Sequence, residues 1–302
     1  MSESPLIFDR ALIRRRRQRA NVLDAATFLL DHAADDLVDR LGAVLRRFEI
    51  AVDLGTPTDA VCNALARRGA ADTIIAVCTT DEGLPPASGN EKIVVADEEA
   101  LPFRDGSLDL VVSALTLQFV NDLPGTLIQI RRALKPDGLF MAALIGGETL
   151  TELRQAFAAA ESELEGGVSP RVAPFADVRE LGALLQRAGF ALPVTDVDRL
   201  CVRYDSVFAL MHDLRRMAAT NALVERRRVP LRRATLLRMA EIYGQRFADP
   251  DGRLRATFEI VWLSGWAPHP SQQQPLRPGS ARARLADALG TREISTGDKA
   301  GR

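Results

Sequence analysis

The chain has 302 residues, of which 47% are hydrophobic and 26% are charged, and its formal net charge is −1. These values are typical of a globular protein, and they exclude a global field that would recruit nucleic acid or an anionic membrane. The length allows one large domain, or one domain with an elaborate appendage.

The cysteines and the distribution of apolar residues indicate the cellular compartment of the protein. Cys62, Cys78 and Cys201 are scattered without CxxC spacing, which favours reduced thiols in a cytosolic compartment. No apolar run approaches the ~20 residues that a membrane helix needs. The first residues lack the apolar segment of a signal peptide, and Glu3 and Asp9 argue against an organelle transit peptide.

The first half of the chain predicts two helices followed by alternating strands and helices. Apolar spacing predicts the helices at about 12–30 and 33–48. The remaining elements are expected strands at 50–55, 73–77, 93–96, 108–113 and 139–143, with helices at 59–68 and 123–134. This alternation predicts a doubly wound α/β sheet with parallel pairing. Such sheets bind ligands at the carboxyl ends of their strands.

The second half of the chain has a different succession of predicted helices and strands. Helices are expected after Gly146 and at 177–187, and strands at 193–203 and 255–262, with about fifty residues of arginine-rich helix between those strands. We expect this insertion to cover the open edge of the ligand cleft. The predicted division is an N-terminal helical cap, a nucleotide-binding core, a remainder of the core with a helical lid, and a disordered tail, at 1–48, 49–145, 146–290 and 291–302.

Two stretches are the most informative about the fold. Residues 94–103 form a short apolar run that ends in acids, beginning with Asp97 and Glu98, and residues 134–140 read as a helix end, a tight turn and a strand. Together with the order of elements, they resemble the class I S-adenosylmethionine-dependent methyltransferases. The resemblance implies a Rossmann-like, mostly parallel, seven-stranded sheet with a helical insertion over the cleft.

Further blocks are more specific than the shared fold, and they span about 8–290. They lie at 8–10, 96–103, 120–124, 146–150, 165–170, 184–190, 265–266 and 271–272. Together they resemble the methyltransferase-like assembly factor 5 family of the respiratory NADH:ubiquinone oxidoreductase, complex I. That family's mitochondrial member hydroxylates an arginine on a complex I iron–sulfur subunit.

The resemblance implies a function, a cofactor and partners. It implies a bacterial protein that modifies an arginine of a complex I subunit, with S-adenosylmethionine as cofactor. The implied partner is a complex I iron–sulfur subunit or its assembly intermediate, with no nucleic acid involved. The implied location is the cytoplasm, with transient contact at the inner face of the membrane.

The cofactor-binding candidates follow the strand ends. A glycine after the first strand lets backbone approach a ligand, and an acid after the third strand can accept from an adenine amine. The candidates are Asp53, Gly55, Thr56, Asp97, Glu98 and Ser113.

Two of the usual cofactor elements are altered. The loop 53–59 keeps one glycine of the family's Asp-x-Gly-x-Gly-x-Gly pattern, and Pro57 has no amide donor. No acid directly follows the second strand, where residues 76–80 read Ala-Val-Cys-Thr-Thr. Each lost carboxylate hydrogen bond costs a ligand about 1.5–3 kcal/mol.

Catalytic residues are not assigned. Gln118 stands where many relatives have histidine, and with Arg154 it is a candidate to position substrate; an amide is a poor base. The three histidines lie in separate segments and form no facial triad, so no metal site is expected, and no Gly-x-Ser-x-Gly elbow is present.

Trp262 and Trp266 are expected in the core. The arginine runs 14–17 and 226–228 are either solvated helix faces or docking surfaces.

Three functions stay open. The first is an assembly-factor enzyme that modifies an arginine with S-adenosylmethionine bound, which Asp97 favours. The second is a methyltransferase acting on a small molecule or an acyl carrier, which the family-specific blocks disfavour. The third is a non-catalytic assembly scaffold, which the altered glycine loop favours.

Overall fold

The computed structural model describes residues 6–79, 91–273, 280 and 285–292. Contacts divide the chain into two units, 1–268 and 269–302. In the second unit the structure describes the short helix α9 (Leu285–Leu289). Most of the expected tail, from residue 293 onward, lies outside the described residues.

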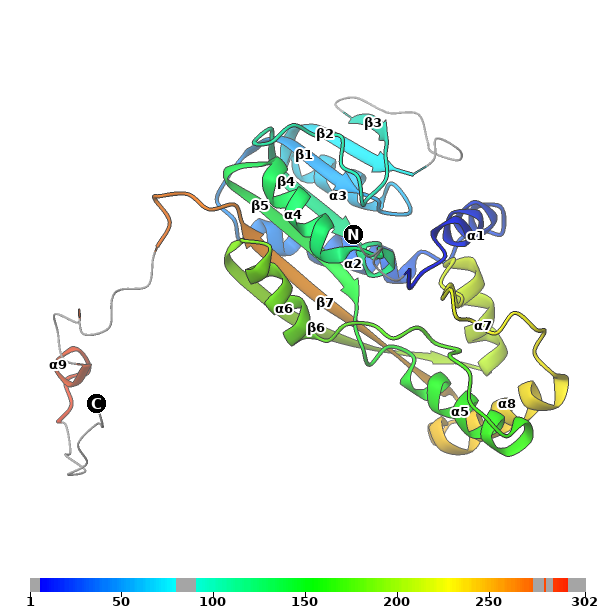
Figure 1. Cartoon of the computed structure of the whole chain (residues 1–302). Helices are drawn as coiled ribbons and strands as arrows, with labels where there is room; N and C mark the ends of the chain where they lie inside the picture. Colours follow the sequence, from blue (N-terminus) through cyan, green and yellow to red (C-terminus); the bar gives the residue numbers. More distant parts are fainter. Residues whose placement is uncertain (1–5, 80–90, 274–279, 281–284, 293–302) are drawn as a thin grey trace. The chain divides into compact units, whose positions relative to one another are not determined.

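The first unit is built on a seven-stranded sheet with the order β3-β2-β1-β4-β5-β7-β6 (Figure 1). The first five strands of that order pair in parallel, whereas β7 is antiparallel to both β5 and β6. The strands are β1 (Phe48–Leu54), β2 (Ala71–Cys78), β3 (Glu91–Val95), β4 (Leu108–Ala114), β5 (Leu134–Ile145), β6 (Ala191–Tyr204) and β7 (Leu254–Trp266). The strand order reverses between β1 and β4, so a ligand crevice is expected at the carboxyl ends of these two strands.

Helices cover both faces of the sheet. Those of the first unit are α1 (Arg10–Val22), α2 (Phe28–Gly42), α3 (Ala60–Arg68), α4 (Leu123–Ala133), α5 (Thr151–Glu165), α6 (Val178–Arg187), α7 (Val207–Arg216), α8 (Arg233–Phe247) and the 3₁₀ turn η1 (Leu117–Phe119). Buried residues of α2, α3, α5, α7 and α8 form one core with the sheet, and those of α4 and α6 form another. These two layers around the sheet confirm the predicted doubly wound α/β class.

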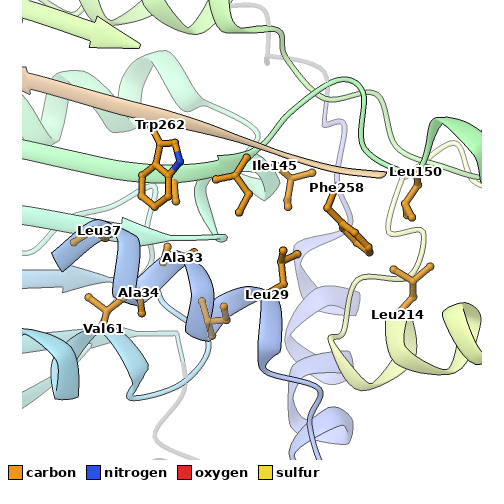
Figure 2. Close-up of a cluster of buried hydrophobic side chains, with 14 of the residues drawn as sticks. Leu29, Ala33, Ala34, Leu37, Val61, Ile145, Leu150, Leu214, Phe258 and Trp262 are labelled. Carbon is orange, nitrogen blue, oxygen red and sulfur yellow. The ribbon is translucent and has the colours of Figure 1, made fainter. Parts of the chain in front are cut away.

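Alternation along the central strands explains the two cores. In β5, Leu139 and Met141 face the first core, whereas Phe140 and Ala142 face the second. Both faces of a parallel strand are buried in such a fold, so its sequence reads as a nearly continuous apolar run. Figure 2 shows Leu37 of α2 and Trp262 of β7 in the first core. The predicted core position of Trp262 is confirmed.

The N-terminal helix prediction is wrong in its boundaries. The helix expected at 12–30 is interrupted, because α1 ends at Val22 and α2 begins at Phe28. Within the break Asp24 adopts φ of +59°, and Arg216 donates to its carbonyl oxygen at 2.6 Å. A tertiary contact therefore stabilises a break that apolar periodicity does not reveal. Likewise, the helix expected to reach residue 48 ends at Gly42, since Phe48 is already a buried residue of β1.

The arginine-rich insertion is helical only in part. Helices α7 and α8 are separated by the non-helical segment 217–232. The α8 helix lies beside α5 (Figure 1), and its Tyr243 hydroxyl donates to the carbonyl oxygen of Arg255 on β7 at 2.7 Å. Among the helices of the described residues, none has the length and apolar character of a membrane span.

Candidate functional site

Buried side chains form hydrogen bonds that stabilise the loop after β1. The Thr56 hydroxyl donates to the Asp53 carboxylate and accepts from the Ala114 amide at 3.2 Å. The Ser113 hydroxyl donates to the carbonyl oxygen of Leu54 at 2.7 Å. The structure therefore brings these three predicted cofactor residues together, and their polar atoms are engaged with one another and with backbone. They support the loop.

The carboxyl of Asp53 has a raised pKa. Burial raises the pKa of its carboxyl to about 7, although hydrogen bonds from Thr56 and Cys62 lower it. The cause is that a charged carboxylate loses its hydration inside the fold. The side-chain donors to the Asp53 carboxylate are the Thr56 hydroxyl and the Cys62 thiol, whose sulfur lies 3.5 Å away. Both donors are neutral, and among the described residues no cationic side chain pairs with this carboxylate.

The acids after β3 bind an arginine of the same chain. Arg10 of α1 forms hydrogen-bonded ion pairs with Asp97 and Glu98, and its guanidinium lies 3.0 Å from a carboxylate oxygen of Glu99. The Glu98 side chain is only 2% exposed and that of Arg10 is 15% exposed. One guanidinium thus lies among three carboxylates, of which Glu98 is buried and Asp97 and Glu99 are partly exposed; hydrogen bonds between charged groups are stronger than those between neutral groups. We refer to Asp97, Glu98 and Glu99 as the acidic cluster.

Two further arginines of α1 face the acidic cluster. Arg14 lies 3.7 Å from Asp97, and Arg17 lies 3.5 Å from Glu98. Residues 10, 14 and 17 share one face of a helix because they are spaced by four and three. Burial alone would raise the pKa of Asp97, but the Glu99 amide and the Arg10 guanidinium hold it below its usual range.

The start of α1 is fixed by its own sequence. The Asp9 carboxylate accepts from the Leu12 amide at 2.9 Å, which is an N-cap contact. The same carboxylate pairs with Arg226 at 3.1 Å. Phe8 packs edge-on against Phe119, with ring centroids 5.6 Å apart. These contacts place Arg10 over the acidic cluster.

Arg10 lies next to the acids predicted to bind the adenine of S-adenosylmethionine. A crevice of about 20 Å³ lies between α1 and the strand ends, lined by Arg10, Arg17, Glu98 and neighbouring residues; ligand pockets usually measure about 300–1,000 Å³. Gly55 has φ of +74°, and a Cβ atom there would lie 2.8 Å from both Glu98 and Thr116. Glu98 and Thr116 therefore fill the space over the glycine, and Arg10 engages the acid expected to receive adenine.

A much larger cavity, of about 630 Å³, lies beside the crevice. It shares Arg17 and Phe119 with the crevice, and Pro57 and Thr58 of the β1 loop also line it. Its walls come from α1, the segment before α2, η1, α5, α7 and the segment 217–231. The predicted lid insertion thus contributes α7 and the segment after it to the walls.

The two predicted substrate residues have different positions. Gln118 lines the large cavity, and its side-chain oxygen is buried with no hydrogen-bond partner among the described residues. Arg154 is not among the cavity residues, and its guanidinium donates to the carbonyl oxygens of Gly147 and Thr149 at 3.2 and 3.4 Å. Gln118 is thus part of the cavity lining, Arg154 makes a local contact with backbone, and a role of either residue in substrate binding stays a prediction.

The sheet order, with β7 inserted antiparallel between β5 and β6, and the glycine loop after β1 define the class I methyltransferase fold. A family model described as a methyltransferase domain matches residues 52–142. The solved structure of the YcgJ protein from Bacillus subtilis superimposes with a TM-score of 0.53 at 16% identity, over 77% of this chain and 98% of that one. This likeness concerns the fold.

Comparison with named proteins identifies the family within this fold class. The mitochondrial protein "Arginine-hydroxylase NDUFAF5" of Danio rerio is 37% identical over 287 residues, which are 93% of this chain and 89% of the relative. The Homo sapiens protein of that name is 39% identical over 284 residues, 91% of this chain and 81% of the relative. The "Malonyl-[acyl-carrier protein] O-methyltransferase" of Laribacter hongkongensis is 41% identical over 187 residues, 62% of this chain and 60% of the relative. The chain belongs to the family of the arginine-hydroxylase NDUFAF5 proteins.

The acidic cluster's partner is the main feature that sequence reasoning did not identify. The sequence shows Arg10 only as part of the block at 8–10, and it does not distinguish a solvated face from a docking surface for the run 14–17. In the structure Arg14, Arg16 and Arg17 all make contacts within the chain, whereas Arg15 is exposed. The spacing of 10, 14 and 17 opposite three consecutive acids was the available signal.

Proposed function

We propose that this protein acts in the assembly of respiratory complex I by recognising an arginine side chain on a subunit. The partner proposed is an iron–sulfur subunit or an assembly intermediate that contains it. Family membership supports this role, because the similarity covers more than nine-tenths of the chain and the relatives are named as arginine hydroxylases.

The observation that carries the proposal is the acidic cluster itself. Asp97, Glu98 and Glu99 surround one guanidinium at the carboxyl edge of the sheet, where doubly wound folds bind their ligands. A buried carboxylate such as Glu98 is costly unless it is paired. The cluster is therefore suited to hold an arginine, and Arg10 is the one it holds in this structure.

Arg10 occupies the position that a partner's arginine would take. It comes from α1, at the start of the described chain, and α1 also lines the large cavity. A subunit segment that displaces Arg10 would meet the same three carboxylates. The ion pairs of Arg10 with the acidic cluster therefore compete with the binding of a partner's arginine.

The reaction on the arginine is not assigned. Methylation would need S-adenosylmethionine; the match to a methyltransferase domain supports that cofactor, which stays a prediction. Hydroxylation would need an oxidant that these residues do not provide. The proposal therefore rests on recognition of the arginine.

The test is complementation in a bacterial strain that lacks this protein. We expect wild type to restore complex I assembly and a mass shift on one arginine of a subunit, measured by mass spectrometry of the purified complex. Glu98→Gln should restore neither, since it removes the buried negative charge. Glu225→Gln, which changes an exposed acid outside the cluster, is the matched control and should restore both.

The closed crevice favours a second candidate, a non-catalytic assembly scaffold. Under that function, wild type restores assembly but no arginine of the complex changes mass. The acyl-carrier alternative is supported by relatives over about three-fifths of the chain. It predicts that complex I assembly is unaffected by loss of the protein.

A further inference from the structure

The large cavity has an apolar floor. Figure 2 shows Leu29, Ile145, Leu150, Leu214 and Phe258 around this region, and all five are buried and line the cavity. They come from α2, the end of β5, the residue before α5, α7 and β7. Its volume of about 630 Å³ lies within the range of pockets that hold drug-sized ligands.

The same cavity is lined by cationic side chains and by no acid among the described residues. Its lining includes the arginines Arg16, Arg17, Arg171, Arg215, Arg216, Arg226, Arg227 and Arg228. Five of these pair with carboxylates that lie outside the lining, namely Arg17, Arg171, Arg216, Arg226 and Arg227. Their charges are therefore largely neutralised within the fold.

Three arginines of the lining are not neutralised in this way. Arg16 donates to the carbonyl oxygens of Thr220 and Asn221 at 2.6 and 2.8 Å, and no carboxylate lies at ion-pair distance from it in the described part of the chain. Arg215 and Arg228 are exposed, and the described residues offer neither of them a carboxylate partner. The cavity thus combines an apolar floor with an excess of positive charge.

Gln118 adds a neutral polar group. Its buried side-chain oxygen has no hydrogen-bond partner among the described residues, and an unpartnered buried acceptor costs about 1–3 kcal/mol. A ligand that carries a hydroxyl or amide donor would satisfy it. A deprotonated carboxylate has no such donor, so this oxygen does not select an anionic head group.

We propose that this cavity binds an amphipathic anion, a molecule with an apolar chain and a carboxylate or phosphate head. The chain would pack on the apolar floor, and the head would pair with Arg215 and Arg228. A cationic side chain would be disfavoured here, so this site is distinct from the acidic cluster. The inference does not rest on the proposed function, because neither the apolar floor nor these two arginines belong to that cluster.

The test is calorimetric titration of the full-length protein with decanoate, decyl phosphate, decanol and decyltrimethylammonium. We expect decanoate or decyl phosphate to bind at least tenfold more tightly than decanol, and the cation to bind most weakly. Whichever anion binds more tightly identifies the head group. Acetate should give no measurable heat, because it lacks the apolar chain.

Variants assign the binding to the arginines. The double variant Arg215→Ala with Arg228→Ala should lower anion affinity at least tenfold and leave decanol binding unchanged. Both side chains are exposed and make no ion pair in the described residues, so the fold should persist, which circular dichroism checks. Arg15→Ala removes an exposed charge of α1 outside the cavity and should have no effect. Equal affinity for decanoate and decanol, an unaffected double variant, or no binding by folded wild type would each overturn the proposal.

Discussion

Replacing Asp53 by asparagine tests the buried network beneath the β1 loop. Asp53 is 3% exposed, and burial raises the pKa of its carboxyl from 3.8 to about 7. Between these two values the folded protein keeps a proton that the unfolded chain has released. The free energy of unfolding therefore falls as pH rises through this window, and above pH 7 the destabilisation is complete.

The size of the effect follows from the two pKa values. At about 1.4 kcal/mol per pKa unit, a rise from 3.8 to about 7 destabilises the folded state by about 4 kcal/mol at high pH. Roughly 2–3 kcal/mol of this develops between pH 5 and pH 8. Asparagine carries no charge at either pH. Relative to wild type, the free energy of unfolding of the Asp53→Asn protein should therefore rise by roughly 2–3 kcal/mol between pH 5 and pH 8.

The assay is urea unfolding of both proteins at pH 5, 6, 7 and 8, with the midpoint and slope fitted at each pH. Asp59→Asn is the matched control, because Asp59 follows in the same loop, is exposed, and makes no side-chain cap hydrogen bond. Its difference from wild type should not change with pH. A constant difference between Asp53→Asn and wild type across the series would refute the account of the buried carboxyl.

Three further substitutions test the fold by thermal or urea unfolding. Gly55→Ala should destabilise by more than about 1 kcal/mol, because φ is +74° and Glu98 and Thr116 already fill the space; an unchanged midpoint would contradict this. Tyr243→Phe removes a hydrogen bond to a backbone oxygen at 2.7 Å and should cost about 0.5–1.5 kcal/mol; a gain in stability would argue against it. Leu37→Ala empties a fully buried position of the first core and should cost about 2–5 kcal/mol; a loss below 1 kcal/mol would mean that the site collapses.

The sequence predicted the central sheet well because its signals are local. Apolar runs such as 108–113 and 139–143 alternate with helical patterns, and the acids after 94–96 locate the carboxyl edge. These patterns report burial on both faces of parallel strands. Gln118 is singled out by the resemblance rather than by these local patterns; it lies in the cavity lining, and its role stays a prediction.

The errors and omissions have a common cause in long-range contacts. The break between α1 and α2 is stabilised by Arg216, which is 192 residues away from Asp24. The pairing of Arg10 with Glu98 spans 88 residues. The large cavity also assembles segments from across the chain, so its excess of arginines could not be separated from a solvated helix face by sequence spacing. Such features depend on tertiary packing, which periodicity does not encode.

The most direct test of the central claim is calorimetric binding of an arginine-containing peptide to wild type and Arg10→Ala. Removing Arg10 leaves Glu98 buried with Arg17 as its remaining close cation, so the variant should be less stable alone and should bind the peptide at least tenfold more tightly than wild type. The Arg15→Ala protein should match wild type, and a peptide with glutamine in place of arginine should not bind. Equal affinities of wild type and Arg10→Ala, or no binding by the folded variant, would contradict recognition of a partner's arginine by the acidic cluster.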